Sequence, residues 1–225
     1  MSRVIGLAAL AATGLALVLG LVVAPEAAIQ GESQRLMYVH VPSAWTAFAS
    51  FGVVGLCSAA VLLRRPGHWG AVALAAGEVG VVATGLTLAE GSLWGHMAWG
   101  TWWAWDPRLV STALLFLSYL GYLAMRGLPG DAAEQRAAAA GLLFLLEIPV
   151  VHFSVLWWPS LHQQATILRP SLTPPIEGRM FLALMVALLA STLGAAWYVM
   201  RRTDQLVATP AAEPVVDAPA PEVLR

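Results

Sequence analysis

The sequence contains little charge and no lysine. Only 11% of its residues are charged, its cationic side chains are all arginine, and no run of basic residues occurs. A nucleic-acid-binding surface needs clustered cations to neutralise phosphates, so we expect no nucleic-acid partner.

Cysteine is almost absent as well. The single Cys57 lies within an apolar run, so no internal disulfide can form, and we interpret this residue as a small packed hydrophobe. A zinc site needs three or four closely spaced Cys, His or carboxylate ligands. The sequence shows no such cluster, which argues against zinc chemistry.

Apolar residues, in contrast, make up 59% of the chain, and the mean hydropathy of +0.72 lies outside the range of soluble domains. A bilayer core about 30 Å thick needs roughly 20 apolar helical residues. Six stretches meet this requirement: 4–24, 42–63, 70–90, 108–125, 138–158 and 179–200. The sequence therefore predicts an all-α integral membrane protein whose six transmembrane helices form a bundle.

The first apolar stretch and the C-terminal residues form the two ends of the chain. Residues 4–24 could be a signal peptide, but their apolar run is longer than a usual signal sequence, so we predict an uncleaved span. We assign residues 1–202 to the transmembrane domain. Residues 203–225 are rich in Pro, Ala, Glu and Val without periodicity, and we predict a disordered cytoplasmic tail.

The distribution of arginine predicts the orientation. With the N-terminus inside, seven arginines lie on the cytoplasmic side and four outside (Arg35, Arg108, Arg169 and Arg179). Both termini are then cytoplasmic. The outer connections, about 25–41, 91–107 and 159–178, hold three of the five histidines and five of the ten tryptophans. Since connecting segments often carry function, we expect the functional site there.

Five tryptophans crowd into the segment from Trp94 to Arg108: Trp94, Trp99, Trp102, Trp103 and Trp105. The 99/102/103 and 102/105 spacings would place the rings on one face of a helical turn. Gly95 and Gly100 would let a flat molecule approach the backbone, and Asp106-Pro107 closes the segment. An interfacial aromatic belt is the alternative, although a belt needs only scattered rings. We favour a platform for a large planar ligand.

Two histidines lie beside this segment. His40 precedes Pro42 at the outer mouth of the second span. His162 follows Trp158 by four residues, roughly 6 Å beyond the fifth span if the helix continues. Either imidazole alone could be a simple solvated side chain. Together they could supply both axial ligands of a haem iron, while indoles cover the macrocycle.

Other residues could complete such a site. Arginines meet haem propionates, and the nearest candidates in the sequence are Arg35, Arg108 and Arg169. His96, within the tryptophan-rich segment, is a possible substitute ligand.

Three ionisable residues lie inside predicted spans: Glu78, Glu147 and His152. Such residues are costly in a membrane and normally pair with one another or line a pathway, so packing and function both stay open. Pro149 could kink the fifth span. In a continuous helix, His152 would lie roughly 15 Å deeper than His162, too deep to share its iron.

Three blocks of sequence carry a resemblance to a known family: Tyr38-Val-His-Val-Pro-Ser-Ala-Trp45, Trp99-Gly-Thr-Trp-Trp-Ala-Trp-Asp-Pro-Arg-Leu109 and His152-Phe-Ser-Val-Leu-Trp-Trp-Pro-Ser-Leu-His-Gln163. In this order, and with six spans, they resemble the haem-handling membrane proteins of cytochrome c maturation, most closely the haem exporter protein C family. The resemblance covers about residues 4–200.

The resemblance implies a binding and transfer protein of the bacterial inner membrane rather than an enzyme. It implies that His40 and His162 are the axial ligands of non-covalent haem b. Trp99, Trp102, Trp103, Trp105 and Asp106 would form the haem platform on the periplasmic side. The implied partners are a membrane-tethered haem chaperone, which binds haem covalently through its own histidine, and the ABC transporter subunits and a small membrane subunit of the same pathway.

Two other functions are compatible with the sequence. A cytochrome b-type electron-transfer subunit would also bind haem through histidines, but usually within the spans, where only His152 lies. A proton-coupled transporter could use Glu78, Glu147 and His152, but should have discontinuous helices and an internal repeat, and no repeat is visible.

Overall fold

The computed structural model describes residues 2–130, 132–164 and 176–209, and within these ranges the regular structure is helical apart from one isolated bridge between Ala27 and Gly31. The α-helices are α1 (Ser2–Val18), α2 (Met37–Leu62), α3 (Trp69–Trp99), α4 (Pro107–Arg126), α5 (Ala133–Phe144), α6 (Glu147–Trp157) and α7 (Gly178–Ala208). A π-helical turn, Leu19–Val23, follows α1, and a 3-10 turn, Glu32–Leu36, precedes α2. In the described chain six segments are long and apolar enough to cross a membrane, with α5 and α6 forming one of them, so the predicted class and number of spans are confirmed.

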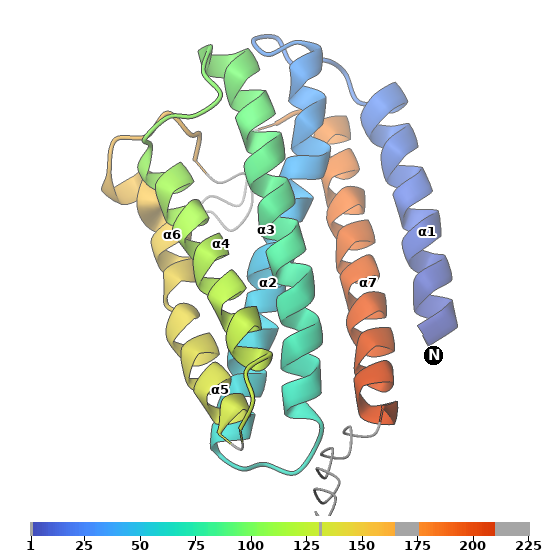
Figure 1. Ribbon diagram of the computed structural model, residues 1–225. Helices are drawn as coiled ribbons and strands as arrows, with labels where there is room; N and C mark the ends of the chain where they lie inside the picture. Colours follow the sequence, from blue (N-terminus) through green and yellow to red (C-terminus); the bar gives the residue numbers. More distant parts are fainter. Residues whose placement is uncertain (1, 131, 165–175, 210–225) are drawn as a thin grey trace, which may run out of the picture.

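The helices stand side by side in a bundle (Figure 1). The α6 and α4 helices lie on one side, α2 and α3 in the centre, and α7 and α1 on the other side. The short α2–α3 and α4–α5 connections lie at the same end as the start of α1 and the end of α7. The connections between α1 and α2, α3 and α4, and α6 and α7 lie at the opposite end, which we call the loop-rich end. Its assignment to the outer side of the membrane stays a prediction.

The centre of the bundle depends on small residues of α3. Phe51 of α2 stacks on Tyr119 of α4 with ring centroids 3.5 Å apart. Gly80 of α3 faces Phe51, and a Cβ atom there would overlap the ring. Small residues let transmembrane helices approach closely and gain van der Waals contact. The close packing of α2 against α3 fixes the positions of the residues that these helices carry at the loop-rich end.

Several helices continue beyond their predicted ends. The α2 helix begins before Pro42, so His40 lies in its first turn rather than ahead of the helix. The α3 helix continues to Trp99 and ends where Gly100 adopts a φ of 74°. The α7 helix runs to Ala208, into the segment predicted as tail; residues 210–225 lie outside the described residues. Hydropathy predicts the membrane-crossing part of a helix, and these helices extend past it.

The tryptophan-rich segment therefore has two parts. Trp94, His96 and Trp99 lie on α3, whereas residues 100–106 are not helical. The prediction that Trp102, Trp103 and Trp105 share the face of a helical turn is therefore wrong.

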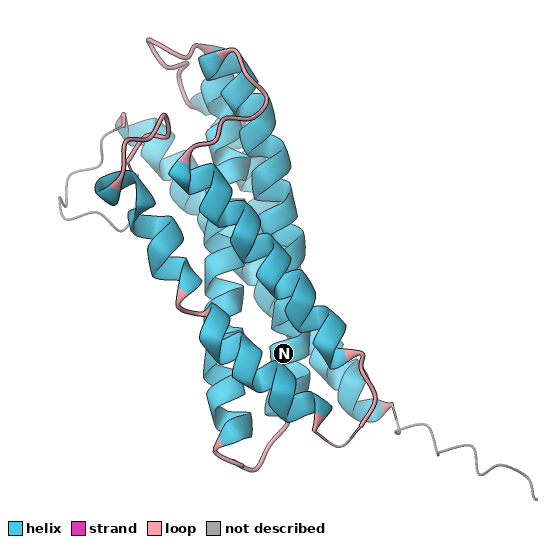
Figure 2. Cartoon of the chain, turned by 60° about the vertical axis from the view of Figure 1, so that its left-hand side comes forward, coloured by secondary structure: helices cyan, strands magenta, loops and turns pink. Residues whose placement is uncertain are grey.

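The fifth span is broken, as Figure 2 shows midway along it. Pro149 is the third residue of α6 and has no N–H to donate to the carbonyl of Leu145, where the helix is interrupted. The α6 helix ends at Trp157, and Trp158 is extended. The expectation that a continuing helix carries His162 outward is therefore wrong, and the chain turns back over the bundle.

The acidic residues of the spans pair with different helices. Glu78 of α3 accepts hydrogen bonds from Tyr198 Oη at 2.9 Å and Arg202 Nη2 at 2.9 Å, both on α7. Glu147 of α6 accepts a hydrogen bond from Ser118 Oγ of α4 at 2.8 Å. Each carboxylate thus joins a pair of helices, which matches the packing interpretation.

The contact between Gly80 and Phe51 makes a test of the packing possible. Replacing Gly80→Ala should lower the free energy of unfolding by about 1–3 kcal/mol, because overpacking displaces the Phe51–Tyr119 stack. Thermal unfolding in detergent measures the effect. The control is Gly121→Ala, where a Cβ atom meets no other atom within 4 Å. A melting temperature of the Gly80 variant at or above that of the control would contradict this account of the core.

Candidate functional site

A cavity of about 240 Å³ lies at the loop-rich end between α2, α3, α4 and α6. Polar and aromatic groups gather on its walls: His40, His152, His162, Arg108, Trp94, Trp99 and Trp103. Pockets that enclose a whole small ligand usually measure about 300–1,000 Å³. This cavity would therefore enclose part of a large planar ligand and leave an edge outside.

His40 and His162 meet across this cavity. Their ring centroids lie 6.3 Å apart, with 34° between the ring planes. His40 comes from the first turn of α2, and His162 from the segment after α6. The fold thus brings together the two imidazoles that the sequence singled out.

Their spacing fits one metal ion between the rings. A metal–imidazole nitrogen bond measures about 2.0–2.1 Å, and the nitrogen lies about 1.1 Å from its ring centroid, so two imidazoles on opposite sides of one metal ion have centroids about 6.3 Å apart. The observed separation of 6.3 Å equals this value.

His40 is held in place by α3. A Cβ atom at Gly91 would lie 2.9 Å from Cε1 of His40, so only glycine leaves room for the ring. Trp94 contacts the ring edge to face at a centroid distance of 5.7 Å. Nδ1 of His40 is enclosed by protein, and the Thr87 backbone interacts with the ring.

His162 is oriented by its own loop. Its Nδ1 lies 2.7 Å from the carbonyl oxygen of Gln163. A carbonyl only accepts, so Nδ1 carries the proton and Nε2 keeps a free lone pair, as in metal-bound histidines. Burial and the nearby Arg108 guanidinium lower the pKa of His162 below its ordinary value. The ring is therefore neutral at neutral pH and able to bind a metal.

Asp106 connects the tryptophan-rich segment to the loop of His162. Its Oδ1 accepts a hydrogen bond from the backbone N–H of Arg108 at 2.8 Å and caps α4, with Pro107 as the first helical residue. Its Oδ2 accepts a hydrogen bond from the backbone N–H of Leu161 at 2.7 Å, next to His162. Burial raises the pKa of Asp106, but hydrogen bonds from Ser160 and three backbone N–H groups outweigh it, so the pKa is lowered and the carboxylate is charged.

Asp106 was expected among the residues that contact the ligand. Its side chain is only 4% exposed, and both oxygens are used in these hydrogen bonds. The sequence signal for the capping role is Asp followed by Pro at a helix start. The link from this cap to Leu161 has no sequence signal, because it joins distant parts of the chain.

Arg108 lines the same cavity. Its Nη2 donates to the carbonyl of His152 at 2.7 Å, and its Nε lies 3.4 Å from Ser154 Oγ. Arg35, also proposed to meet propionates, instead contacts Glu32 and the carbonyls of Gly20 and Ala24 and does not line this cavity. Arg169 lies outside the described residues.

The predicted tryptophans divide into two groups. Trp99 and Trp103 line the cavity, and Trp99 approaches His162 edge to face at 6.4 Å. Trp102 and Trp105 do not line it and are 56% and 86% exposed. Trp102 stacks on His96 with ring centroids 4.2 Å apart. Like Trp102, His96 does not line the cavity.

His152 lines the cavity that His40 and His162 share. The helix does not continue from His152 to His162, because α6 ends at Trp157, and the depth of His152 relative to His162 stays a prediction. Sequence reasoning also missed Gly91, whose role depends on the ring of His40 opposite it.

The cavity presents two facing imidazoles between indole walls. In the part of the chain that the structure describes, no group of three or more His, Cys, Asp or Glu side chains could hold a metal ion. Haem brings four equatorial nitrogens of its own and needs two axial ligands from the protein. Two facing imidazoles with indole walls fit this requirement.

Known proteins match this chain over most of its length. Residues 1–214 match the family model described as heme exporter protein C. Curated relatives with this name include that of Bradyrhizobium diazoefficiens, 37% identical over 81% of this chain and 71% of the relative, and that of Haemophilus influenzae, 38% identical over 72% and 68%. That of Escherichia coli strain K12 is 34% identical over 66% of this chain and 61% of the relative. The chain therefore belongs to the heme exporter protein C family, which takes part in haem delivery for cytochrome c maturation.

Proposed function

We propose that this protein binds haem b non-covalently between His40 and His162 on the outer face of the bacterial inner membrane and delivers it to a membrane-tethered haem chaperone. The observation that carries the proposal is the 6.3 Å separation of the two imidazole rings. Family membership supports haem handling, and the loop-rich end is the side with fewer arginines.

In this proposal each cavity residue has a distinct task. The two imidazoles fill both axial positions and limit side reactions of the iron with oxygen. Trp94, Trp99 and Trp103 supply apolar walls for the macrocycle. Arg108 offers its guanidinium to a propionate, because charge-assisted hydrogen bonds to carboxylates are strong.

Delivery requires that the imidazoles release the haem, and the two ligands are held differently. His40 lies on a helix and is wedged against Gly91. His162 lies on a non-helical segment that Asp106 holds through the backbone N–H of Leu161. We therefore assign the first ligand release to His162, with Asp106 as a positioning residue that keeps its loop over the cavity.

The two exposed tryptophans, Trp102 and Trp105, are suited to contact a partner protein. Trp102 and Trp105 face outward beside the cavity, where an approaching chaperone would meet the exposed haem edge. Aromatic anchors are enriched in protein interfaces. The ABC transporter subunits and the small membrane subunit of the pathway are proposed as further partners within the membrane.

The cytochrome b-type alternative has less support. Such subunits usually take both ligands from within the spans, and here His162 lies on a loop. The transporter alternative needs its three ionisable residues in one pathway, whereas Glu78 and Glu147 pair with different helices.

Removing either histidine tests the haem site. His40→Ala and His162→Ala should each remove or shift the Soret band of the purified protein, because one axial bond is lost. Size-exclusion chromatography checks folding, and His68→Ala, at the opposite end of the bundle, is the matched control. Unchanged haem content and spectrum in both variants would sink the assignment.

Asp106→Asn tests the positioning role. Asparagine has an NH2 group in place of one of the two carboxylate oxygens, so either the Arg108 N–H or the Leu161 N–H faces a donor and the His162 loop should loosen. We expect haem affinity to fall about 10- to 100-fold, as for other groups that orient metal ligands. The absorption spectrum should shift from low-spin towards high-spin, and a low-spin spectrum with wild-type affinity would disprove the role.

Exchanging Trp102 and Trp105 for Ala tests the partner surface. These rings lie outside the cavity lining, so the double variant should keep its Soret band yet lower the formation of holo-chaperone several-fold in reconstituted membranes. Wild-type holo-chaperone levels would count against the surface, and loss of the Soret band would assign these rings to haem binding instead.

A further inference from the structure

The connection between α1 and α2 contributes a side chain to the cavity that contains His40 and His162, which we call the histidine cavity. Gln30, within this connection, lines the cavity together with residues of α2, α3, α4 and α6. The sequence pointed to Arg35 alone in this connection, and Arg35 does not line the cavity. Gln30 is therefore a candidate ligand contact that the sequence did not reveal.

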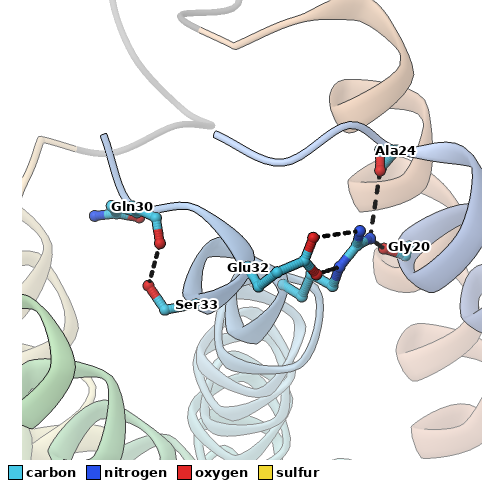
Figure 3. A network of polar contacts seen from close by, with 6 residues as sticks. Gly20, Ala24, Gln30, Glu32 and Ser33 are labelled. Carbon is cyan, nitrogen blue, oxygen red and sulfur yellow. Dashed lines mark hydrogen bonds and ion pairs between the residues drawn. The ribbon is translucent and has the colours of Figure 1, made fainter. Parts of the chain in front are cut away.

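Hydrogen bonds fix the backbone on both sides of Gln30. The Gly31 N–H donates to the Ala27 carbonyl at 2.8 Å, and Gly31 has a φ of 55°, which glycine adopts without strain. The Gln30 carbonyl accepts hydrogen bonds from Ser33 Oγ at 2.7 Å, drawn in Figure 3, and from the Ser33 N–H at 3.2 Å. The turn therefore presents the Gln30 side chain from a defined position.

Arg35 ties this connection to the end of α1. Its guanidinium pairs with Glu32 and donates to the carbonyls of Gly20 and Ala24 (Figure 3). Carbonyls at the end of a helix need donors from outside the helix, and Arg35 supplies them. The connection is thus closed at its base, and Gln30 lies within the closed loop.

The histidine cavity has a cation on its wall. Arg108 lines the cavity, and its side chain donates to uncharged groups, the His152 carbonyl and Ser154 Oγ. Among the described residues no Asp or Glu lines the cavity, and none of the ion pairs includes Arg108. Asp106 attracts Arg108 only at longer range. A partly buried cation without an ion-pair partner is costly, so the cavity favours an anionic ligand.

Few other donors in the cavity are available to such a ligand. Its hydroxyl groups already donate to backbone carbonyls: Thr84, Thr87, Ser92 and Thr112. The Gln30 side-chain amide, which carries two N–H donors, makes no hydrogen bond with any described residue. Gln163 and Gln164 also line the cavity, but they belong to the loop from which we expect His162 to be released. Gln30 is the amide whose backbone is fixed independently of that loop.

On the basis of the haem function proposed above, we propose that Gln30 binds a haem propionate, donating a hydrogen bond from its amide to the carboxylate. The propionates are the anionic groups at the edge of haem b, and charge-assisted hydrogen bonds to carboxylates are strong. The contact selects tetrapyrroles with free carboxylates. Because the turn that carries Gln30 is separate from the His162 loop, it keeps its hold on the haem when His162 lets go of the iron.

Two substitutions in the full chain test this contact. Gln30→Leu removes the amide, and Gln30→Glu replaces it with a carboxylate of nearly the same shape. The matched controls are the same two changes at Gln135, which is exposed on α5 at the opposite end of the bundle. Each purified protein is titrated in one detergent with ferric haem b and with its dimethyl ester, which keeps the iron and macrocycle but has no carboxylate. Partition of the ligand into micelles is common to all proteins and cancels in the ratio of dissociation constants.

Gln30→Leu should bind haem b at least about 10-fold more weakly than the wild type, because a hydrogen bond to a charged acceptor is lost. Gln30→Glu should bind it more weakly still, because its carboxylate repels the propionate. For the dimethyl ester both variants should stay within about 3-fold of the wild type, the value of one neutral hydrogen bond. The Gln135 variants should bind both ligands as the wild type does.

Wild-type affinity of the Gln30 variants for haem b, or an equal loss of affinity for haem b and its ester, would overturn the propionate contact. In both cases a low-spin spectrum of the wild type would leave the proposed function standing. A wild-type protein that binds no haem b would overturn the proposed function and this contact together. If one Gln30 variant does not elute as a folded protein in size-exclusion chromatography, the other decides.

Discussion

The carboxylate of Asp106 holds together the two segments that form the outer part of the proposed haem site. One oxygen caps α4 and so fixes the end of the tryptophan-rich segment, and the other holds the loop that carries His162. The carboxylate is buried, and a buried charge is tolerated only when it is fully hydrogen-bonded. The same bonds that keep Asp106 ionised therefore keep His162 facing His40.

The two halves of the site differ in rigidity for a physical reason. His40 belongs to α2, which packs closely on α3. Because Gly91 has no side chain, the His40 ring fits against α3. His162 follows the last residue of α6 and lies on a loop, where a few hydrogen bonds replace helical packing. A protein that must hold its cargo and then release it benefits from one fixed ligand and one that can move.

Much of this organisation could be predicted from the sequence. Six apolar runs of sufficient length gave the correct number of spans, because bilayer thickness fixes the length of a crossing helix. His40, His162, Trp99 and Trp103, which the sequence predicts to bind haem, all line one cavity. Pro149 also interrupts the fifth span, as its missing N–H requires.

The rest depended on tertiary contacts. The α6 helix ends at Trp157, and both His152 and His162 line one cavity. The close approach of Gly91 to the His40 ring joins residues far apart in the chain, and so does the hydrogen bond from the Leu161 N–H to Asp106. Trp99 and Trp103 line the cavity, whereas Trp102 and Trp105 of the same tryptophan-rich segment are exposed. The composition of the segment does not distinguish them.

The central claim is that two imidazoles hold one iron, and near-infrared magnetic circular dichroism of the purified haem-loaded protein tests it most directly. The position of the charge-transfer band of low-spin ferric haem identifies the axial pair. The structure predicts a single low-spin species with bis-imidazole ligation. A high-spin haem, or a low-spin haem whose band belongs to another ligand pair, would contradict the account.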